Sequence, residues 1–116
     1  MQDFLDRYLA KITVVSGPGA GAGFTIDRER VIVGRGPGVD REFDDPEMSR
    51  QHAAIEFSGS GFRLRDLGST NGTLLNGTTV QSADLRDGDR FENGGRRFLL
   101  AIEERKREPD AYELKS

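Results

Sequence analysis

The sequence contains no cysteine, and its single histidine is His52. Without cysteine the chain forms no disulfide and has no thiolate nucleophile, and one histidine does not complete a Cys/His zinc site. We therefore expect no bound metal. Leu, Ile, Val and Phe together make up about a quarter of the 116 residues, which is enough for a hydrophobic core without a covalent cross-link.

Long apolar runs are also absent, because no segment approaches the roughly 18 residues of a membrane span. The first ten residues carry Asp3, Asp6 and Arg7 in place of the apolar centre of a signal peptide. We therefore expect a cytoplasmic protein with no membrane partner. The net charge is −3, whereas nucleic-acid-binding domains usually have a basic stripe and a high pI, so no nucleic-acid partner is expected.

Lysine is scarce, because 14 of the 17 basic residues are arginine. A GC-rich genome would produce this bias. So would a need for planar, bidentate recognition of phosphate or carboxylate, which arginine performs and lysine does not. Composition alone leaves both explanations open.

Short β-type segments separated by turns make up most of the chain. The predicted strands are Lys11–Ser16, Phe24–Asp27, Arg30–Val33, Ala53–Phe57, Phe62–Leu67, Thr73–Leu75, Thr78–Gln81, Arg90–Glu92 and Arg97–Ile102. The 15 glycines and the pairs Asn76-Gly77, Asp87-Gly88 and Asn93-Gly94 predict tight hairpin turns. Many short strands at regular spacing indicate an all-β sandwich or small barrel.

The two ends of the chain fall outside this pattern. Residues 1–10 carry apolar side chains at helical spacing after Asp3 and predict a lead-in that contains a short helix. Residues 104–116 are charged and predict a C-terminal tail. The folded domain is thus expected over residues 11–103, with Arg96-Arg97 on the polar rim of its last strand.

The glycine-rich stretch Ser16–Gly23 does not match a nucleotide-binding loop. Its glycines lack the G-x-G-x-x-G spacing of dinucleotide sites, and the chain has no Gly-Lys pair for a P-loop. No long predicted helix follows that would offer its N-terminus to a phosphate. We expect a hairpin connection here and no cofactor.

Three other loops carry the residues that point to a function. Gly34-Arg35 follows a predicted strand and places an arginine on a loop that this strand holds. Ser49-Arg50-Gln51-His52 and Thr70-Asn71-Gly72 each precede another strand. Taken singly, they are compatible with a solvated arginine and with turns shaped by side-chain-to-backbone hydrogen bonds.

A serine and a histidine three residues apart could also indicate nucleophilic catalysis, with Ser49 as nucleophile and His52 as base. No acidic residue is placed by motif to orient the histidine, and the G-x-S-x-G elbow is absent. We therefore expect no enzyme activity. His52 is expected to shape its loop through hydrogen bonds to the backbone.

In this order and spacing, the three loops together resemble the forkhead-associated (FHA) domain. The surrounding segments match as well, namely Val31-Ile32-Val33, Asp66-Leu67-Gly68-Ser69 and Leu85-Arg86-Asp87-Gly88-Asp89. The resemblance extends over residues 11–103. It implies an all-β, FHA-like sandwich of two sheets with about eleven short strands, whose loops at one end bind phosphothreonine peptides.

The resemblance also implies roles for individual residues. Arg35 would pair with the phosphate, Arg50 would add a second cationic contact, and Ser49 would donate its hydroxyl to another phosphate oxygen. Thr70 would line the phosphothreonine pocket, and Asn71 would hydrogen-bond the backbone of an extended ligand. The residues that would support this site are Gly34, His52 and Gly72.

The implied partner is a phosphothreonine-containing protein, the product of a Ser/Thr protein kinase, bound by a monomeric domain. A phosphate with nearly two negative charges suits arginine and hydroxyl donors held on rigid loops. An alternative is an FHA-like scaffold that binds a folded partner independently of phosphate.

Arg41 departs from the commonest family pattern, which has an aliphatic residue at this position. The acidic run Asp44, Asp45 and Glu47 would give the loop before Ser49 a negative field.

Overall fold

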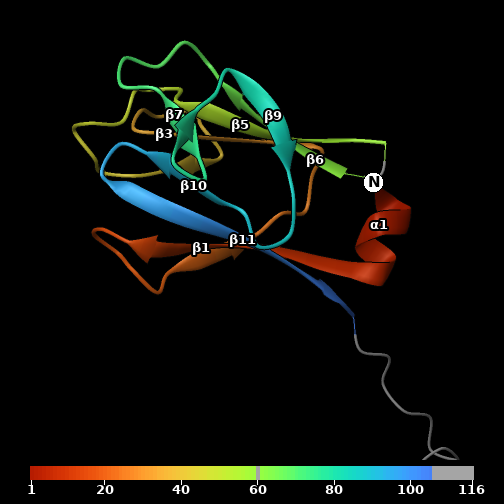
Figure 1. Ribbon diagram of the computed structural model, residues 1–116. Helices are drawn as coiled ribbons and strands as arrows, with labels where there is room; N and C mark the ends of the chain where they lie inside the picture. Colours follow the sequence, from red (N-terminus) through yellow and green to blue (C-terminus); the bar gives the residue numbers. More distant parts are fainter. Residues whose placement is uncertain (60, 106–116) are drawn as a thin grey trace, which may run out of the picture.

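The computed structural model describes residues 1–59 and 61–105. In these residues eleven short and long strands form two sheets that pack face to face, and one helix precedes them (Figure 1). One sheet has the strand order β2-β1-β11-β10-β7-β8, and the other has the order β4-β3-β5-β6-β9. The predicted all-β sandwich of two sheets is therefore confirmed.

The first sheet is organised around two long antiparallel strands, β1 and β11. Its members are β1 (Tyr8–Ser16), β2 (Gly23–Thr25), β7 (Thr73–Leu75), β8 (Thr78–Thr79), β10 (Arg90–Asn93) and β11 (Arg96–Glu104). The β1–β11 pair extends from Tyr8 opposite Glu104 to Ser16 opposite Arg97. It brings the beginning and the end of the folded domain together.

The second sheet carries the strands that lead into the three loops of interest. Its members are β3 (Arg30–Gly34), β4 (Arg41–Glu42), β5 (Ala53–Ser58), β6 (Gly61–Asp66) and β9 (Ser82–Leu85). Only β4 pairs in parallel fashion, with β3, among the pairs described in this sheet. In β6, Phe62 and Leu64 are buried and Arg63 and Arg65 are exposed, as the alternating sequence predicts.

Apolar side chains from the inner faces of both sheets form the core. Phe91 and Phe98 stack within it, with ring centroids 5.0 Å apart. The other large buried residues are Ile12, Val14, Ile26, Val31, Val33, Met48, Ile55, Phe62, Leu64, Leu85 and Leu100. Close packing of this kind resists deformation, so the sheets can hold their connecting loops in fixed positions.

Strand pairing continues beyond residues 11–103 at both ends. Residues 8–10 belong to β1, and Glu104 belongs to β11, because these positions pair with one another. Helix α1 (Gln2–Arg7) lies within the predicted lead-in and packs Phe4 against Phe57, with ring centroids 5.0 Å apart. The rest of the predicted tail, residues 106–116, lies outside the described residues. No described helix has the length and apolar character needed to cross a membrane.

Two local predictions were wrong, and both fail where the chain crosses between sheets. The predicted strand Thr78–Gln81 is too long, since β8 ends at Thr79 in one sheet and residues 80–81 lead to β9, which begins at Ser82 in the other. The Asp87-Gly88 pair is not a hairpin turn, because it connects β9 to β10 in the opposite sheet. Gly88 still has a left-handed backbone, with φ of +87°, which explains the glycine.

The β3–β4, β4–β5 and β6–β7 connections lie at one end of the sandwich. Figure 1 shows them on the left, with α1 at the opposite, right-hand end. Because β5 runs antiparallel to both β3 and β6, the last residues of β3 and β6 lie beside the first residue of β5, at one end of the sheet. This topology gathers loops that are distant in the sequence.

Candidate functional site

The end of β3 and the loop before β5 lie in direct contact. The Arg35 N–H donates to the Ser49 carbonyl oxygen at 3.0 Å, and the Gly36 N–H donates to the Arg50 carbonyl oxygen at 3.3 Å. A Cβ on Gly34 would overlap the carbonyl oxygen of Arg50, so only glycine allows this approach. The Gly-Arg pair therefore places Arg35 beside the loop that contains Ser49.

The Arg35 side chain is exposed and is held by its Nε, which donates to the Met48 carbonyl oxygen at 3.1 Å. Among residues 1–59 and 61–105, neither Arg35 nor Arg50 has a carboxylate within ion-pair distance. A guanidinium has five N–H donors. Within the described residues the four on the terminal nitrogens of Arg35 have no hydrogen-bond partner, which leaves them for a ligand.

The Ser49 hydroxyl connects the β4–β5 loop with the β6–β7 loop. Its Oγ accepts a hydrogen bond from the Thr70 N–H at 2.9 Å. Because a hydroxyl has one proton and two lone pairs, this contact orients the oxygen and leaves the proton for an acceptor. A phosphate oxygen is such an acceptor.

His52 is fully buried and joins the same two loops from behind. Its Nδ1 accepts a hydrogen bond from the Ser49 N–H at 3.0 Å, and its Nε2 lies 2.7 Å from the Gly72 carbonyl oxygen. Since a backbone N–H only donates, Nδ1 is unprotonated, and Nε2 carries the proton that Gly72 accepts. Both ring nitrogens are thus occupied by backbone groups, which leaves neither to accept the Ser49 hydroxyl proton.

Asn71 projects from the β6–β7 loop and is exposed. Its Nδ2 donates to the Glu47 carbonyl oxygen at 2.8 Å, which uses one of its two N–H groups. Within the described part of the chain, the second N–H and the Oδ1 have no partner. One donor and one acceptor side by side match the main chain of an extended peptide. Gly72 follows with φ of +84°, which turns the chain into β7.

Asp66, at the end of β6, shapes the loop that carries Thr70 and Asn71. Its carboxylate accepts hydrogen bonds from the backbone of Gly68 and Ser69 at 3.1 and 3.0 Å, and from the hydroxyls of Ser69 and Thr73 at 2.5 and 2.7 Å. Burial would raise the pKa of Asp66, but these hydrogen bonds together hold the pKa below its usual value. The ionised carboxylate therefore organises this loop.

Asp45 plays the corresponding part in the β4–β5 loop, and nothing in the sequence singles it out for this. It is buried, and it accepts hydrogen bonds at 2.9 Å from the Glu47 N–H, the Gly95 N–H and Arg96 Nη1. Burial would raise the pKa of Asp45, but the two backbone N–H groups and Arg96 hold the pKa below its usual value. Arg96 is thus part of a buried ion pair instead of the polar rim.

The predicted contact residues border one depression in the surface, of about 340 Å³. Its lining consists of Arg35, Pro46, Glu47, Met48, Ser49, Arg50, Thr70 and Asn71. All five residues expected to contact a phosphopeptide therefore lie together. The three expected supporting residues take part in the contacts that hold the loops, since Gly34 admits Arg50, and His52 bonds to Gly72.

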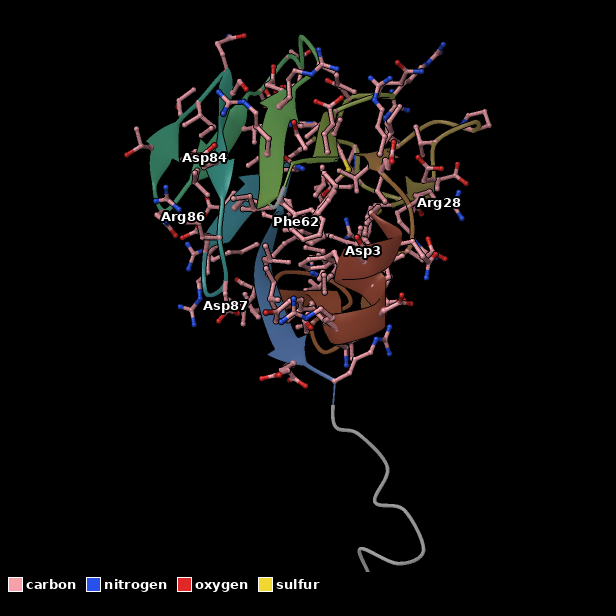
Figure 2. The ribbon with its side chains drawn as sticks, turned by 90° about the vertical axis from the view of Figure 1, so that its right-hand side faces the viewer. Asp3, Arg28, Phe62, Asp84, Arg86 and Asp87 are labelled. Carbon is pink, nitrogen blue, oxygen red and sulfur yellow. The ribbon has the colours of Figure 1, made fainter. Side chains whose placement is uncertain are left out.

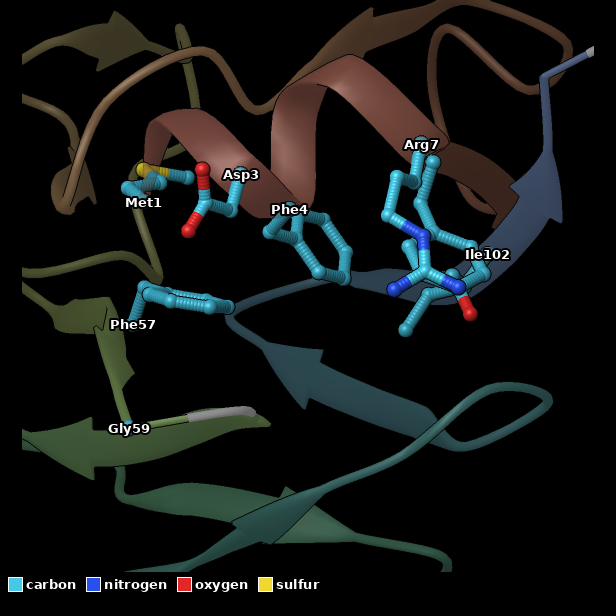
Figure 3. Close-up of a pocket in the computed structure, with 8 residues that line it drawn as sticks. Met1, Asp3, Phe4, Arg7, Phe57, Gly59 and Ile102 are labelled. Carbon is cyan, nitrogen blue, oxygen red and sulfur yellow. The ribbon is translucent and has the colours of Figure 1, made fainter.

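A larger hollow, of about 540 Å³, lies at the opposite end between α1 and the sandwich (Figure 3). Phe4 points from α1 toward Phe57, and Ile102 closes another side. Its arginine, Arg7, lies 5.7 Å from the centroid of the Tyr8 ring. None of the predicted site residues lines this hollow. Its lining contains one arginine and does not bring together several hydrogen-bond donors that could bind a phosphate.

Comparison with known proteins agrees with this arrangement. Residues 31–94 match the FHA domain family, and this stretch includes all three loops. The match covers more than half of the chain. The chain therefore belongs to the FHA domain family, whose members are phosphothreonine-binding modules.

Several curated relatives are named as a regulator or an inhibitor. The chain is 39% identical over 91 residues to the glycogen accumulation regulator GarA of Mycolicibacterium smegmatis, which covers 78% of this chain and 58% of the relative. It is 37% identical over 91 residues to the oxoglutarate dehydrogenase inhibitor of Corynebacterium jeikeium, covering 78% of this chain and 63% of that protein. The chain thus spans about three-fifths of the length of these relatives.

Solved structures support the same fold. One, from a study of phosphothreonine-dependent FHA domain interactions, has a TM-score of 0.73 and 30% identity, covering 80% of this chain and 95% of that one. Another, the FhaA FHA domain in complex with the intracellular domain of a second protein, has a TM-score of 0.71 and 31% identity, covering 78% and 98%. The fold predicted from the resemblance is confirmed.

Proposed function

We propose that this domain is a non-catalytic reader of phosphothreonine, which binds proteins phosphorylated by a Ser/Thr protein kinase. The observation that carries the proposal is the pair of arginines, Arg35 and Arg50, which border the depression without a carboxylate partner in the described residues. A phosphate group has nearly two negative charges and three strong acceptor oxygens. Two guanidinium groups beside a hydroxyl supply matching charge and directional donors.

Each contact residue then has a distinct task. The terminal nitrogens of Arg35 pair with the phosphate, Arg50 adds a second positive charge, and the Ser49 hydroxyl donates its free proton to a phosphate oxygen. Thr70 forms part of the wall around the threonine side chain. Asn71 uses its free N–H and Oδ1 to align the ligand main chain across the loops.

The wider role that we propose is regulatory. Two relatives are named as a regulator of glycogen accumulation and an inhibitor of oxoglutarate dehydrogenase, and both names describe a regulatory role. We expect this domain to act as a cytoplasmic monomer that recruits a phosphorylated partner. The hydrogen bonds of His52 support a binding role over hydrolysis, because both of its ring nitrogens contact backbone groups. His52 therefore cannot act as a base for the Ser49 hydroxyl.

A phosphothreonine-peptide library with degenerate flanking positions tests the proposal directly. The best-binding sequence is then synthesised with phosphothreonine, phosphoserine or unmodified threonine and titrated by calorimetry. We expect binding of the phosphothreonine form and none of the unmodified form. Phosphoserine should bind more weakly by about 1–3 kcal/mol if the threonine methyl is well packed.

The same titration separates the alternative function. A scaffold that binds a folded partner independently of phosphate would capture its partner from cell extract equally well before and after phosphatase treatment. Loss of capture after phosphatase treatment supports the reader. Equal capture, together with no affinity for any phosphopeptide in the library, would replace the reader with the scaffold.

A further inference from the structure

A buried ion pair between Asp45 and Arg96 lies behind the depression. Arg96 Nη1 is 2.9 Å from Asp45 Oδ2, and the two side chains are only 10% and 6% exposed. In each other ion pair of the described residues, both side chains are at least 28% exposed. Desolvation largely offsets the attraction within a buried pair, so net stability is a weak explanation for its presence.

Arg96 joins three separate connections of the sandwich. Besides Asp45 in the β4–β5 loop, its Nε donates to the Pro18 carbonyl oxygen in the β1–β2 loop at 3.0 Å. Its guanidinium carbon lies 5.2 Å from the centroid of the Phe43 ring. Arg96 itself follows the Gly94-Gly95 turn between β10 and β11.

The glycine pair in this turn admits the Asp45 carboxylate. The Gly95 N–H donates to Asp45 Oδ2 at 2.9 Å. A Cβ on Gly94 would lie 2.8 Å from the same oxygen, closer than real Cβ contacts allow, and Gly94 also has φ of +60°. The turn is therefore shaped to receive this carboxylate.

Asp45 in turn fixes the backbone of the loop that follows it. Its Oδ1 accepts a hydrogen bond from the Glu47 N–H at 2.9 Å, and its carbonyl oxygen accepts one from the Met48 N–H at 3.1 Å. These two bonds hold the peptide groups of residues 45–48 in one turn. The carbonyl groups of Glu47 and Met48 are thereby held in fixed directions.

These two carbonyl groups hold two side chains of the depression. The Glu47 carbonyl oxygen accepts from Asn71 Nδ2 at 2.8 Å, and the Met48 carbonyl oxygen accepts from Arg35 Nε at 3.1 Å. In the described residues these are the only hydrogen bonds that the Asn71 and Arg35 side chains make. The orientation of both therefore depends on the turn that Asp45 organises.

We propose that Arg96 and Asp45 are positioning residues for the binding site: the ion pair sets the 45–48 turn, and the turn aims Arg35 and Asn71. Neither residue lines the depression, so both act through other groups. Binding costs less when the contact groups are already held in the bound geometry. The inference rests on the proposed function for its effect on affinity, but its effect on the two side chains exists in the free protein.

The test compares Arg96→Met with Arg97→Met. Arg97 is the next residue of β11, and its Nη2 forms an exposed ion pair with Glu92, so it controls for the loss of one arginine from this strand. Affinity for the phosphothreonine peptide selected from the library is measured well below the melting temperature. We expect about tenfold weaker binding for Arg96→Met and less than twofold change for Arg97→Met.

Proton–nitrogen correlation spectra of the unliganded variants provide a readout that general destabilisation does not move. We expect the Arg35 Nε–H signal and the Asn71 side-chain NH₂ signals to shift or broaden in Arg96→Met and to stay in place in Arg97→Met. Arg96→Lys keeps a positive charge beside Asp45 and should recover part of the affinity and of the spectrum. If Arg96→Met does not fold, Arg96→Lys and Asp45→Asn are measured in its place.

The outcomes distinguish this inference from the function on which it rests. Unchanged Arg35 and Asn71 signals in a folded Arg96 or Asp45 variant overturn the positioning role, whether or not a phosphopeptide binds. Shifted signals with unchanged peptide affinity also overturn it, because the geometry would then not matter for binding. If no phosphopeptide binds the wild-type domain, the proposed function fails, and the spectra of the free protein still decide whether the ion pair aims the two side chains.

Discussion

Arginines on the outer face of the second sheet and arginines in the binding loops have opposite surroundings. On the sheet, Arg30, Glu56, Arg63 and Asp84 face one another in register across β3, β5, β6 and β9. Arg63 lies 2.8 Å from Asp84, and Arg30 lies 3.4 Å from Glu56. Figure 2 labels Asp84 and Arg86 at the β9 edge of this surface. Positive and negative charges therefore alternate and satisfy one another.

At the loop end, two carboxylates, those of Asp45 and Asp66, are engaged by other groups. Asp66 is surrounded by backbone N–H groups and hydroxyls, and Asp45 by backbone N–H groups and Arg96. Neither is available to Arg35 or Arg50. Because these two acids are engaged elsewhere and Glu47 forms no ion pair in the described residues, Arg35 and Arg50 keep their charges for an anionic ligand. A domain with a net charge of −3 can in this way present the phosphate site that we propose.

The largest effect that the comparison predicts comes from exchanging one loop arginine and one sheet arginine for alanine. Arg35→Ala should lower phosphopeptide affinity by about 2–5 kcal/mol, because it removes one partner of a desolvated charge pair. Arg63→Ala, the matched control, should bind as the wild type does. Calorimetric titration of both variants gives the answer. Arg35→Ala binding within about threefold of wild type would contradict the assignment.

The second prediction concerns the carboxylates and is smaller. Asp66→Asn should destabilise the domain by about 1–3 kcal/mol, because several donors lose an ionised acceptor. Asp84→Asn, in the exposed charge row, should cost about 0.2–1 kcal/mol. Denaturant unfolding of the two variants measures both values. Equal losses would mean that the two regions do not differ in the way proposed.

The direction of the pKa shifts adds a pH test to that prediction. The pKa values of Asp45 and Asp66 are held below 3.8, so both carboxylates contribute stability that is present above that pH and is lost as the pH falls through their folded-state values. In the neutral range the contribution should be constant. Below about pH 4 the difference in unfolding free energy between the wild type and Asp66→Asn should therefore decrease. A difference that stays constant as the pH falls through this range would contradict the lowered pKa of Asp66.

Much of this arrangement could be predicted from the sequence, and the failures share a cause. Alternation in Phe62–Leu67 specified β6, because one buried and one solvated face leave a local pattern. The order of three loops specified the fold through the family resemblance. The β8-to-β9 crossing left no local pattern, since Val80 and Gln81, which connect the two strands, also suit a continued strand.

The supporting interactions of the site were harder to predict for the same reason. Asp45 and Arg96 are 51 positions apart. The segment around Asp45 shows only an Asp-Pro turn, and the segment around Arg96 shows only a pair of arginines. Asp45 was expected to add to a negative field, but burial beside Arg96 removes it from the surface. A signal existed in the Gly94-Gly95 pair, because two glycines after a strand indicate close approach of another group as well as a turn.

The third prediction tests the pairing within the charge row itself. Arg63→Ala removes both the ion pair with Asp84 and a hydrogen bond from Arg63 Nε to the Ser82 hydroxyl at 2.8 Å. Because these groups are about half exposed, the loss of folding stability should be about 0.2–1 kcal/mol and should decrease as salt is added. Thermal unfolding at low and high ionic strength checks this, and a salt-independent loss would show that packing of the arginine stem matters more than its charge.

The smallest expected effect concerns the acid that the loop end does expose. Glu47 lines the depression, and its backbone groups take part in the 45–48 turn, but its carboxylate has no ion-pair partner in the described residues. A negative charge at this position opposes a phosphate ligand, so Glu47→Gln should tighten phosphopeptide binding by about two- to threefold at low salt. The backbone contacts stay intact in this variant, so a change in affinity reports the loss of the charge and not a change in loop geometry.

Asp44→Asn, at an exposed neighbouring position outside the lining, is the matched control and should change affinity less. Because both positions are solvated, the gain should disappear at high ionic strength. Weaker binding of Glu47→Gln would mean that the carboxylate helps to orient Arg35 or Arg50, and the arginines of the loops would then be less free than the comparison with the sheet implies.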